Sequence, residues 1–174
     1  MEDKDLKVKF SGLKDGEHHF NMLVGKAFFT SCQSELLNDG EVKIDLTFMK
    51  FPTHFKLDFK LNGWILANCD RCATEYHQPI ETDFSMVVKL GDDFEEVDPE
   101  MVIIPRSEFE LDLSQWIFEY LVLSIPAKMI CEEQVEGLKC DEEVLARLEV
   151  VNKQKENPIW DALKGLKDSN ESNN

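Results

Sequence analysis

The sequence lacks the features that mark membrane-spanning or secreted proteins. All of its apolar runs are well short of the ~20 residues needed to cross a bilayer. The N-terminal stretch from Met1 to Asp5 is charged, and no apolar signal-peptide segment follows it. The five cysteines, an odd number with no signal peptide, are therefore expected to be thiols or metal ligands rather than disulfides. We predict a soluble cytoplasmic protein with no membrane partner.

The sequence also lacks the short motifs that carry common enzyme chemistry. No P-loop, GxGxxG, GxSxG or HExxH motif is present. The four histidines are scattered, and the paired carboxylates lie in charge runs, which is typical of a solvated surface. We therefore predict a protein that acts by binding, without catalysis and without a small-molecule substrate.

Positive charge is scarce, and it is scarcest in the second half of the chain. Residues 91–174 contain 8 Lys and Arg against 21 Asp and Glu, whereas residues 1–90 contain 11 against 14. Nucleic-acid backbones are bound through Lys and Arg that displace counterions, so the second half is not expected to bind RNA directly. Its acidity instead suits a basic protein partner.

What the sequence does contain is a series of alternating apolar and polar residues in its first hundred positions. Period-two alternation predicts β-strands, each with one buried face, as in an antiparallel sheet with one solvated side. The strands are expected at residues 6–10, 17–24, 42–48, 55–61 and 80–88. The acidic residues 92–100 are expected to form an exposed loop. The apolar residues 101–105 are expected to form an edge strand that ends at its proline.

Helical periodicity appears mainly in the second half. A short helix is expected at 26–32 and an acidic one at 141–151. Residues 112–125 place Leu113, Ile117 and Leu121 on one face of a helix that Pro126 ends. Residues 158–167 are expected to form a last helix, with Asn157 before its first turn and Pro158 in it, and they carry an apolar stripe that includes Trp160 and Leu163.

These patterns together predict an α+β fold. An antiparallel β-sheet spans residues ~5–104, and C-terminal helices pack on it or extend from it. Residues 1–150 are expected to form a single domain with the CxxC motif near its middle. Residues 151–174 are expected to be a linker, a short amphipathic helix and a disordered tail.

The clearest chemical signal is Cys69-Asp70-Arg71-Cys72, which follows the strongest strand pattern. Two residues between cysteines place both sulfurs on one side of a tight turn, as in a zinc knuckle or a redox dithiol. A redox CxxC opens a helix, whereas the flanks here are strand-like and Asp70 adds negative charge. Cys131 and Cys140 are separated by eight residues, a wider spacing than usual, but ligands need only meet in space. The candidate zinc ligands are Cys69, Cys72, Cys131 and Cys140; the alternative is four reduced structural cysteines.

Four motifs occur in a characteristic order. They are Cys69-Asp70-Arg71-Cys72, the Leu-rich helix ending at Pro126, Cys131 followed by Gly137-Leu138-Lys139-Cys140, and Asn157-Pro158 followed by Ala162-Leu163. Over roughly residues 55–167 this order resembles the YceD family, the large ribosomal RNA subunit accumulation proteins. In many members of that family the loop after the Leu-rich helix carries four cysteines, whereas the corresponding loop of this chain, residues 131–140, has only Cys131 and Cys140.

The resemblance implies a non-enzymatic ribosome-biogenesis factor that supports accumulation or processing of large-subunit (23S) rRNA. The implied partners are a pre-large-subunit particle, its rRNA or a basic ribosomal protein. We expect RNA or partner binding through residues on the sheet half and on the last helix, namely Arg71, Lys43, Lys56, Lys60, Trp160 and Leu163. The alternative is a zinc-knuckle protein-interaction module unrelated to ribosomes.

Overall fold

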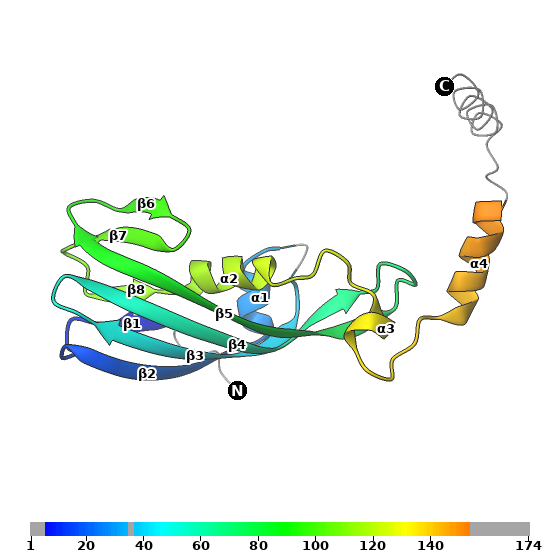
Figure 1. Ribbon diagram of the computed structural model, residues 1–174, viewed down its shortest axis with the longest axis horizontal. Coiled ribbons are helices and arrows are strands. Elements are labelled where there is room, and N and C mark those ends of the chain that lie inside the picture. The colour runs from blue at the N-terminus through cyan, green and yellow to red at the C-terminus, as the bar shows by residue number, and fades with distance from the viewer. Residues whose placement is uncertain (1–5, 35–36, 154–174) are drawn as a thin grey trace, which may run out of the picture.

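The computed structural model describes residues 6–34 and 37–153 of the 174-residue chain. This part is an α+β fold with a mostly antiparallel six-stranded sheet in the order β2-β3-β4-β5-β7-β6 and a two-stranded sheet of β1 and β8 (Figure 1). The strands are β1 (Lys7–Lys9), β2 (Gly16–Val24), β3 (Gly40–Lys50), β4 (His54–Asn68), β5 (Glu75–Gly91), β6 (Glu95–Asp98), β7 (Met101–Pro105) and β8 (Glu110–Asp112). The helices are α1 (Lys26–Ser31), α2 (Ser114–Leu123), α3 (Cys131–Gln134) and α4 (Glu142–Lys153). No helix within these ranges is long and apolar enough to cross a membrane.

The main core lies against one face of the large sheet. Over residues 42–48 of β3 and 55–61 of β4 every second side chain is apolar and buried, and the register sets Ile44 beside Leu61 and Phe48 beside Leu57. Burial of an aliphatic or aromatic side chain contributes about 1.5–3 kcal/mol, so the alternation stabilises this register. The predicted strands in residues 17–88 are confirmed, and β4 and β5 are longer than expected.

Helix α2 lies within the predicted range 112–125, but it begins two residues later than expected, at Ser114. The Asp112 Oδ1 atom accepts the Ser114 backbone N–H at 3.0 Å, which satisfies one free donor at the helix start. Leu113, Ile117 and Leu121 are fully buried in the same cluster as the apolar side chains of β3, β4 and β5. The apolar face predicted for residues 112–125 is therefore confirmed.

The sheet differs from the expectation in its acidic region. Residues 95–98 form strand β6 rather than part of a loop, and β6 pairs antiparallel with β7. Residues 101–105 are therefore an interior strand, paired in parallel with β5 on their other side, and β6 is the edge. All four residues of β6 are exposed and only one is apolar, so backbone pairing forms the strand without any hydrophobic alternation. A charged edge strand also discourages pairing with other chains.

The first strand is also placed differently from the expectation. Rather than joining a single sheet over residues ~5–104, β1 pairs with β8, so that Val8 lies opposite Leu111. Leu6, Val8 and Phe10 are buried as the alternation predicts, but their partner strand is about a hundred residues away in sequence. The alternation of apolar and polar residues indicates that one face of β1 is buried, but it does not indicate which strand pairs with β1.

The paired strands β4 and β5 run beyond the main core to a second, smaller buried cluster. This cluster consists of Ala67, Cys69, Cys72, Tyr76, Ile130, Cys131 and Cys140. Val144 and Leu145 of α4 pack against it, and Figure 1 shows α4 extending away from the sheet. The acidic helix predicted at 141–151 is confirmed as α4. The last predicted helix, with Trp160 and Leu163, lies outside the described residues, and the division of the chain at residue 150 stays a prediction.

Candidate metal centre

The Cys69–Cys72 motif forms the tight connection between β4 and β5. The Ala73 N–H donates to the Cys69 carbonyl at 2.8 Å, and the Cys69 N–H donates to the Thr74 carbonyl at 2.9 Å. Ala73 adopts a left-handed backbone with φ of 59°, which turns the chain back into β5. The motif therefore lies between two antiparallel strands, as predicted, and not at the start of a helix as a thioredoxin-like dithiol would.

The second pair of cysteines comes from the segment that joins α2 to α4. Cys131 is the first residue of α3, an element the sequence suggested only as a loop, and Cys140 lies two residues before α4. Between them Gly137 has a φ of 82°, in the left-handed region that glycine adopts without steric cost. This turn lets the chain reverse after α3 and return Cys140 to the side of Cys131.

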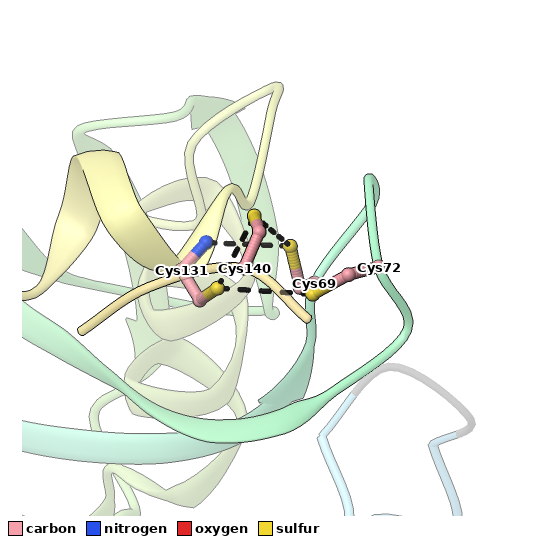
Figure 2. Close-up of side chains that lie close together, drawn as sticks. All are labelled: Cys69, Cys72, Cys131 and Cys140. Carbon is pink, nitrogen blue, oxygen red and sulfur yellow. Dashed lines mark hydrogen bonds between the residues drawn. The ribbon is translucent and has the colours of Figure 1, made fainter. Parts of the chain in front are cut away.

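The four cysteine side chains meet in space, and we call them the cysteine cluster (Figure 2). The sulfur separations are 3.8 Å for Cys69 and Cys140, 3.9 Å for Cys72 and Cys131, and 3.6 Å for Cys131 and Cys140. All four sulfurs lie within 4.8 Å of one another, and all four residues are buried. A tetrahedral Zn²⁺ with Zn–S bonds of about 2.3 Å requires sulfurs ~3.8 Å apart. The separations therefore fit a four-thiolate zinc site with no open position, the arrangement of structural rather than catalytic zinc.

Hydrogen bonds lower the pKa of both thiols in the CxxC motif. Burial raises the pKa of Cys69, but the backbone N–H groups of Cys131, Cys72 and Arg71 outweigh it and lower the pKa overall. Hydrogen bonds from the Thr74 hydroxyl and from the backbone of Asp141 and Thr74 lower the pKa of Cys72 to about 6. These N–H and O–H donors favour the thiolate, which is the form that ligates metal.

The other two thiols depend on a cation for ionisation. Burial, which outweighs a hydrogen bond from Cys140, raises the pKa of Cys131. Burial and the neighbouring cysteines raise the pKa of Cys140 to about 12. Four buried thiolates repel one another without a compensating charge, and a divalent cation supplies that charge. The donor set therefore fits Zn²⁺ in its chemistry as well as in its spacing.

Asp70 and Arg71, the two residues inside the CxxC motif, connect it to the segment that carries Cys131. The Asp70 N–H donates to the Met129 carbonyl at 2.8 Å, and the Asp70 Oδ2 atom accepts the Met129 N–H at 2.7 Å. Arg71 forms ion pairs with Glu132 and, at 3.5 Å, with Glu133. Both residues thus join the β4–β5 turn to the start of α3, a role that the sequence reasoning missed. The sequence did contain a signal for this contact: Arg71 lies next to Cys72, and the oppositely charged Glu132 and Glu133 follow Cys131.

A buried polar network holds α3 against β5. The Tyr76 hydroxyl donates to Gln78 Oε1 at 2.6 Å, and Gln78 Nε2 donates to Gln134 Oε1 at 3.3 Å. Gln78 is only 2% exposed and also donates to the Pro79 carbonyl, so its amide is satisfied. Burial and the charges of Cys69, Cys131 and Asp70 raise the pKa of Tyr76 to about 12, which keeps its hydroxyl a donor.

The lysines proposed for RNA binding lie on the solvated face of the sheet, away from the cysteine cluster. The register places Lys60 between Asp45 of β3 and Asp83 of β5. Lys56 pairs with Asp58 at 2.9 Å, and Lys43 lies opposite Asn62. Acidic and basic side chains therefore alternate on this face rather than forming a basic patch. RNA binding by Arg71, Lys43, Lys56 and Lys60 stays a prediction.

Comparison with known proteins gives a family match. A family model described as "Large ribosomal RNA subunit accumulation protein YceD" matches residues 57–167, which include the whole cysteine cluster. Searches of curated proteins and of solved structures gave no match. The family's description names the accumulation of a ribosomal RNA and no enzymatic activity. Because the matched segment covers well over half of the 174 residues, the chain belongs to the YceD family.

Proposed function

We propose that this chain is a non-enzymatic ribosome-biogenesis factor that supports the accumulation or processing of large-subunit (23S) rRNA in the cytoplasm. The observation that carries this proposal is the family match over residues 57–167, whose description names large-subunit rRNA accumulation. The protein acts by binding RNA or a basic ribosomal protein of a pre-large-subunit particle.

The distribution of charge favours the basic protein as the direct contact. The chain has a net charge of −16, and the polar face of the large sheet alternates acids and bases. Binding to a phosphate backbone depends on clustered Lys and Arg, whereas lysine-rich ribosomal proteins are attracted to an acidic surface. In that case the bound ribosomal protein would bring the chain to the rRNA of the particle, and exposed lysines of the chain could add direct RNA contacts.

Zinc has a structural role in this proposal. Cys69, Cys72, Cys131 and Cys140 hold one Zn²⁺, which joins the β4–β5 turn to the segment that carries α3 and α4. When bound, the ion supplies the positive charge that four buried thiolates need, and its binding energy stabilises that junction. Four thiolate ligands would leave no position open for a substrate, so the ion would stabilise the fold rather than take part in a reaction.

Tagged purification from growing cells, followed by gradient sedimentation, tests the function. We expect the protein to sediment with immature large-subunit particles, and its depletion to lower mature 23S rRNA relative to small-subunit rRNA. A protein that purifies without ribosomal RNA or protein would contradict the proposal. It would favour a zinc-knuckle interaction module unrelated to ribosomes, to which the same cysteine cluster is suited.

A further inference from the structure

Trp116, on α2, separates two hollows in the surface at the end of the sheet formed by β6 and β7. The larger, of about 420 Å³, is bounded by β7, β8 and Lys7, with Ile104 in its lining. The smaller, of about 300 Å³, is bounded by β6, β7 and Met86, with Val102 in its lining. Ile104 and Val102 lie on the same side of β7, and Trp116 lines both hollows, so the hollows are neighbours along β7 and α2. We call the two hollows together the Trp116 groove.

The lining of the Trp116 groove is strongly acidic. Its carboxylates are Glu108, Glu110 and Asp112 in the larger hollow and Glu96, Asp98 and Glu119 in the smaller one. Among the described residues that line the groove, Lys7 is the only cation, and it is shared between Glu110 at 3.7 Å and Asp112 at 3.8 Å. Within the described chain, the Glu96 and Glu108 side chains have no hydrogen-bond or ion-pair partner. The groove therefore has more negative charge than the protein itself neutralises.

Large apolar side chains lie at the same place. Phe94 lines the larger hollow with 57% of its surface exposed, and the apolar side chains of Ile104 and Leu111 line it as well. Trp116 packs against the main core but remains partly open between the hollows. Exposed apolar side chains gathered at a groove mark interaction surfaces, and aromatic rings attract guanidinium and ammonium groups.

We infer that the Trp116 groove binds an Arg- and Lys-rich segment of a protein, with cationic side chains on either side of Trp116 and apolar ones against Phe94. Charge complementarity identifies the occupant, since six carboxylates attract Arg and Lys and repel a phosphate backbone. Figure 1 shows β6 and β7 at the end of the molecule opposite α4, so this surface is separate from the cysteine cluster. The inference rests on the proposed function for the source of the segment, a basic ribosomal protein.

The test measures binding of a fluorescent 15-residue peptide that alternates Arg or Lys with Leu to the full chain at physiological salt. The groove variant is Glu96→Lys with Glu108→Lys, one change in each hollow, both at exposed side chains. The matched control is Glu41→Lys with Glu81→Lys, two exposed glutamates of β3 and β5 on the large sheet. Both variants change the net charge equally, so long-range attraction falls equally. A third variant, Phe94→Ala, removes the exposed ring without changing charge.

We expect the groove variant to weaken peptide binding at least tenfold, the control less than twofold, and Phe94→Ala three- to tenfold. Equal weakening by the groove and control variants would overturn the inference, because it would show attraction to net charge alone. Absence of binding by the parent protein would overturn it as well. Binding of a single-stranded RNA probe that is lost in the groove variant would assign the groove to nucleic acid instead.

Sedimentation of the groove variant separates this inference from the proposed function. If the parent protein enters pre-large-subunit particles and the groove variant does not, both stand. If both proteins enter the particles, the function stands and the groove is not its docking surface. If neither enters while the parent still binds the peptide through the groove, the proposed function fails and the basic-segment site remains.

Discussion

At the scale of single residues, the cysteine cluster depends on contributions from two distant turns. Cys69 lies 71 residues from Cys140, and Cys72 lies 59 residues from Cys131, yet each pair is within 4 Å. A structural zinc ion takes four protein ligands, so all four sulfurs are needed to complete its coordination. Loss of any one ligand is therefore expected to affect the whole site.

Changing Cys140 to Ser tests this dependence. We expect zinc content to fall from roughly one ion per chain to well below half, with a lower melting temperature, because three thiolates and a hydroxyl hold Zn²⁺ less tightly. Metal analysis and thermal unfolding measure both effects. Cys32→Ser is the matched control, since Cys32 lies outside the cysteine cluster. Unchanged metal content in Cys140→Ser would show that the cluster is not a four-thiolate site.

Arg71 is a candidate for two roles: it could stabilise the junction between the β4–β5 turn and α3 through Glu132, or it could bind RNA. Its ion pair with Glu132 is partly exposed, so a double-mutant cycle of Arg71→Ala and Glu132→Ala should give a coupling energy of about 0.5–1 kcal/mol in unfolding. A bracing role predicts this coupling and little change in RNA affinity. A coupling near zero together with weaker RNA binding in Arg71→Ala would favour the nucleic-acid role.

At the scale of elements, the pairing of β3 with β4 depends on a close approach at Gly63. A Cβ atom added there would lie 2.1 Å from the Glu41 carbonyl oxygen and 2.7 Å from the Val42 Cα atom. Both are backbone atoms of the neighbouring strand, so no side-chain rotation relieves the clash. The strands must separate or bend to admit even a methyl group.

Gly63→Ala is therefore expected to destabilise the fold by about 1–3 kcal/mol, the usual cost of overpacking. Urea unfolding followed by circular dichroism measures the change. Gly12→Ala serves as the control, because a Cβ atom there meets no other atom within 4 Å. Equal stability of the two variants would show that β3 and β4 are not held as closely as described.

At the scale of the whole molecule, two separate buried clusters share the strands β4 and β5. The main core contains the apolar residues of the large sheet and α2, and the smaller cluster contains the four cysteines. Regions with their own buried contacts open as separate cooperative units. A zinc ion held by the four cysteines is therefore expected to stabilise the end of the molecule that contains the smaller cluster, and not the main core.

Removing zinc with a chelator tests this division by hydrogen exchange. We expect faster exchange at residues 69–76 and 129–145, while the paired segments 42–48 and 55–61 remain protected. Their protection depends on the main core, which contains none of the four candidate zinc ligands. Uniform loss of protection along the chain would show instead that the metal supports the entire fold.

The local patterns of the sequence determined most of the elements and the identity of the candidate ligands. Apolar residues at every second position require a strand with one buried face, as in β3, β4 and β5, and the helical spacing of Leu113, Ile117 and Leu121 requires the buried face of α2. The CxxC spacing likewise indicates a metal-binding turn. These properties follow from neighbouring residues, because backbone geometry sets which side chains share a face.

Only the tertiary structure decided which elements meet. The pairing of β1 with β8, the interior position of β7, the strand β6 and the meeting of Cys131 with Cys72 all join segments whose own patterns do not name a partner. The Trp116 groove belongs to the same class, since it combines residues of β6, β7, β8 and α2. Such pairings are selected by the total apolar area buried and the backbone hydrogen bonds satisfied, quantities that exist only once the chain is folded.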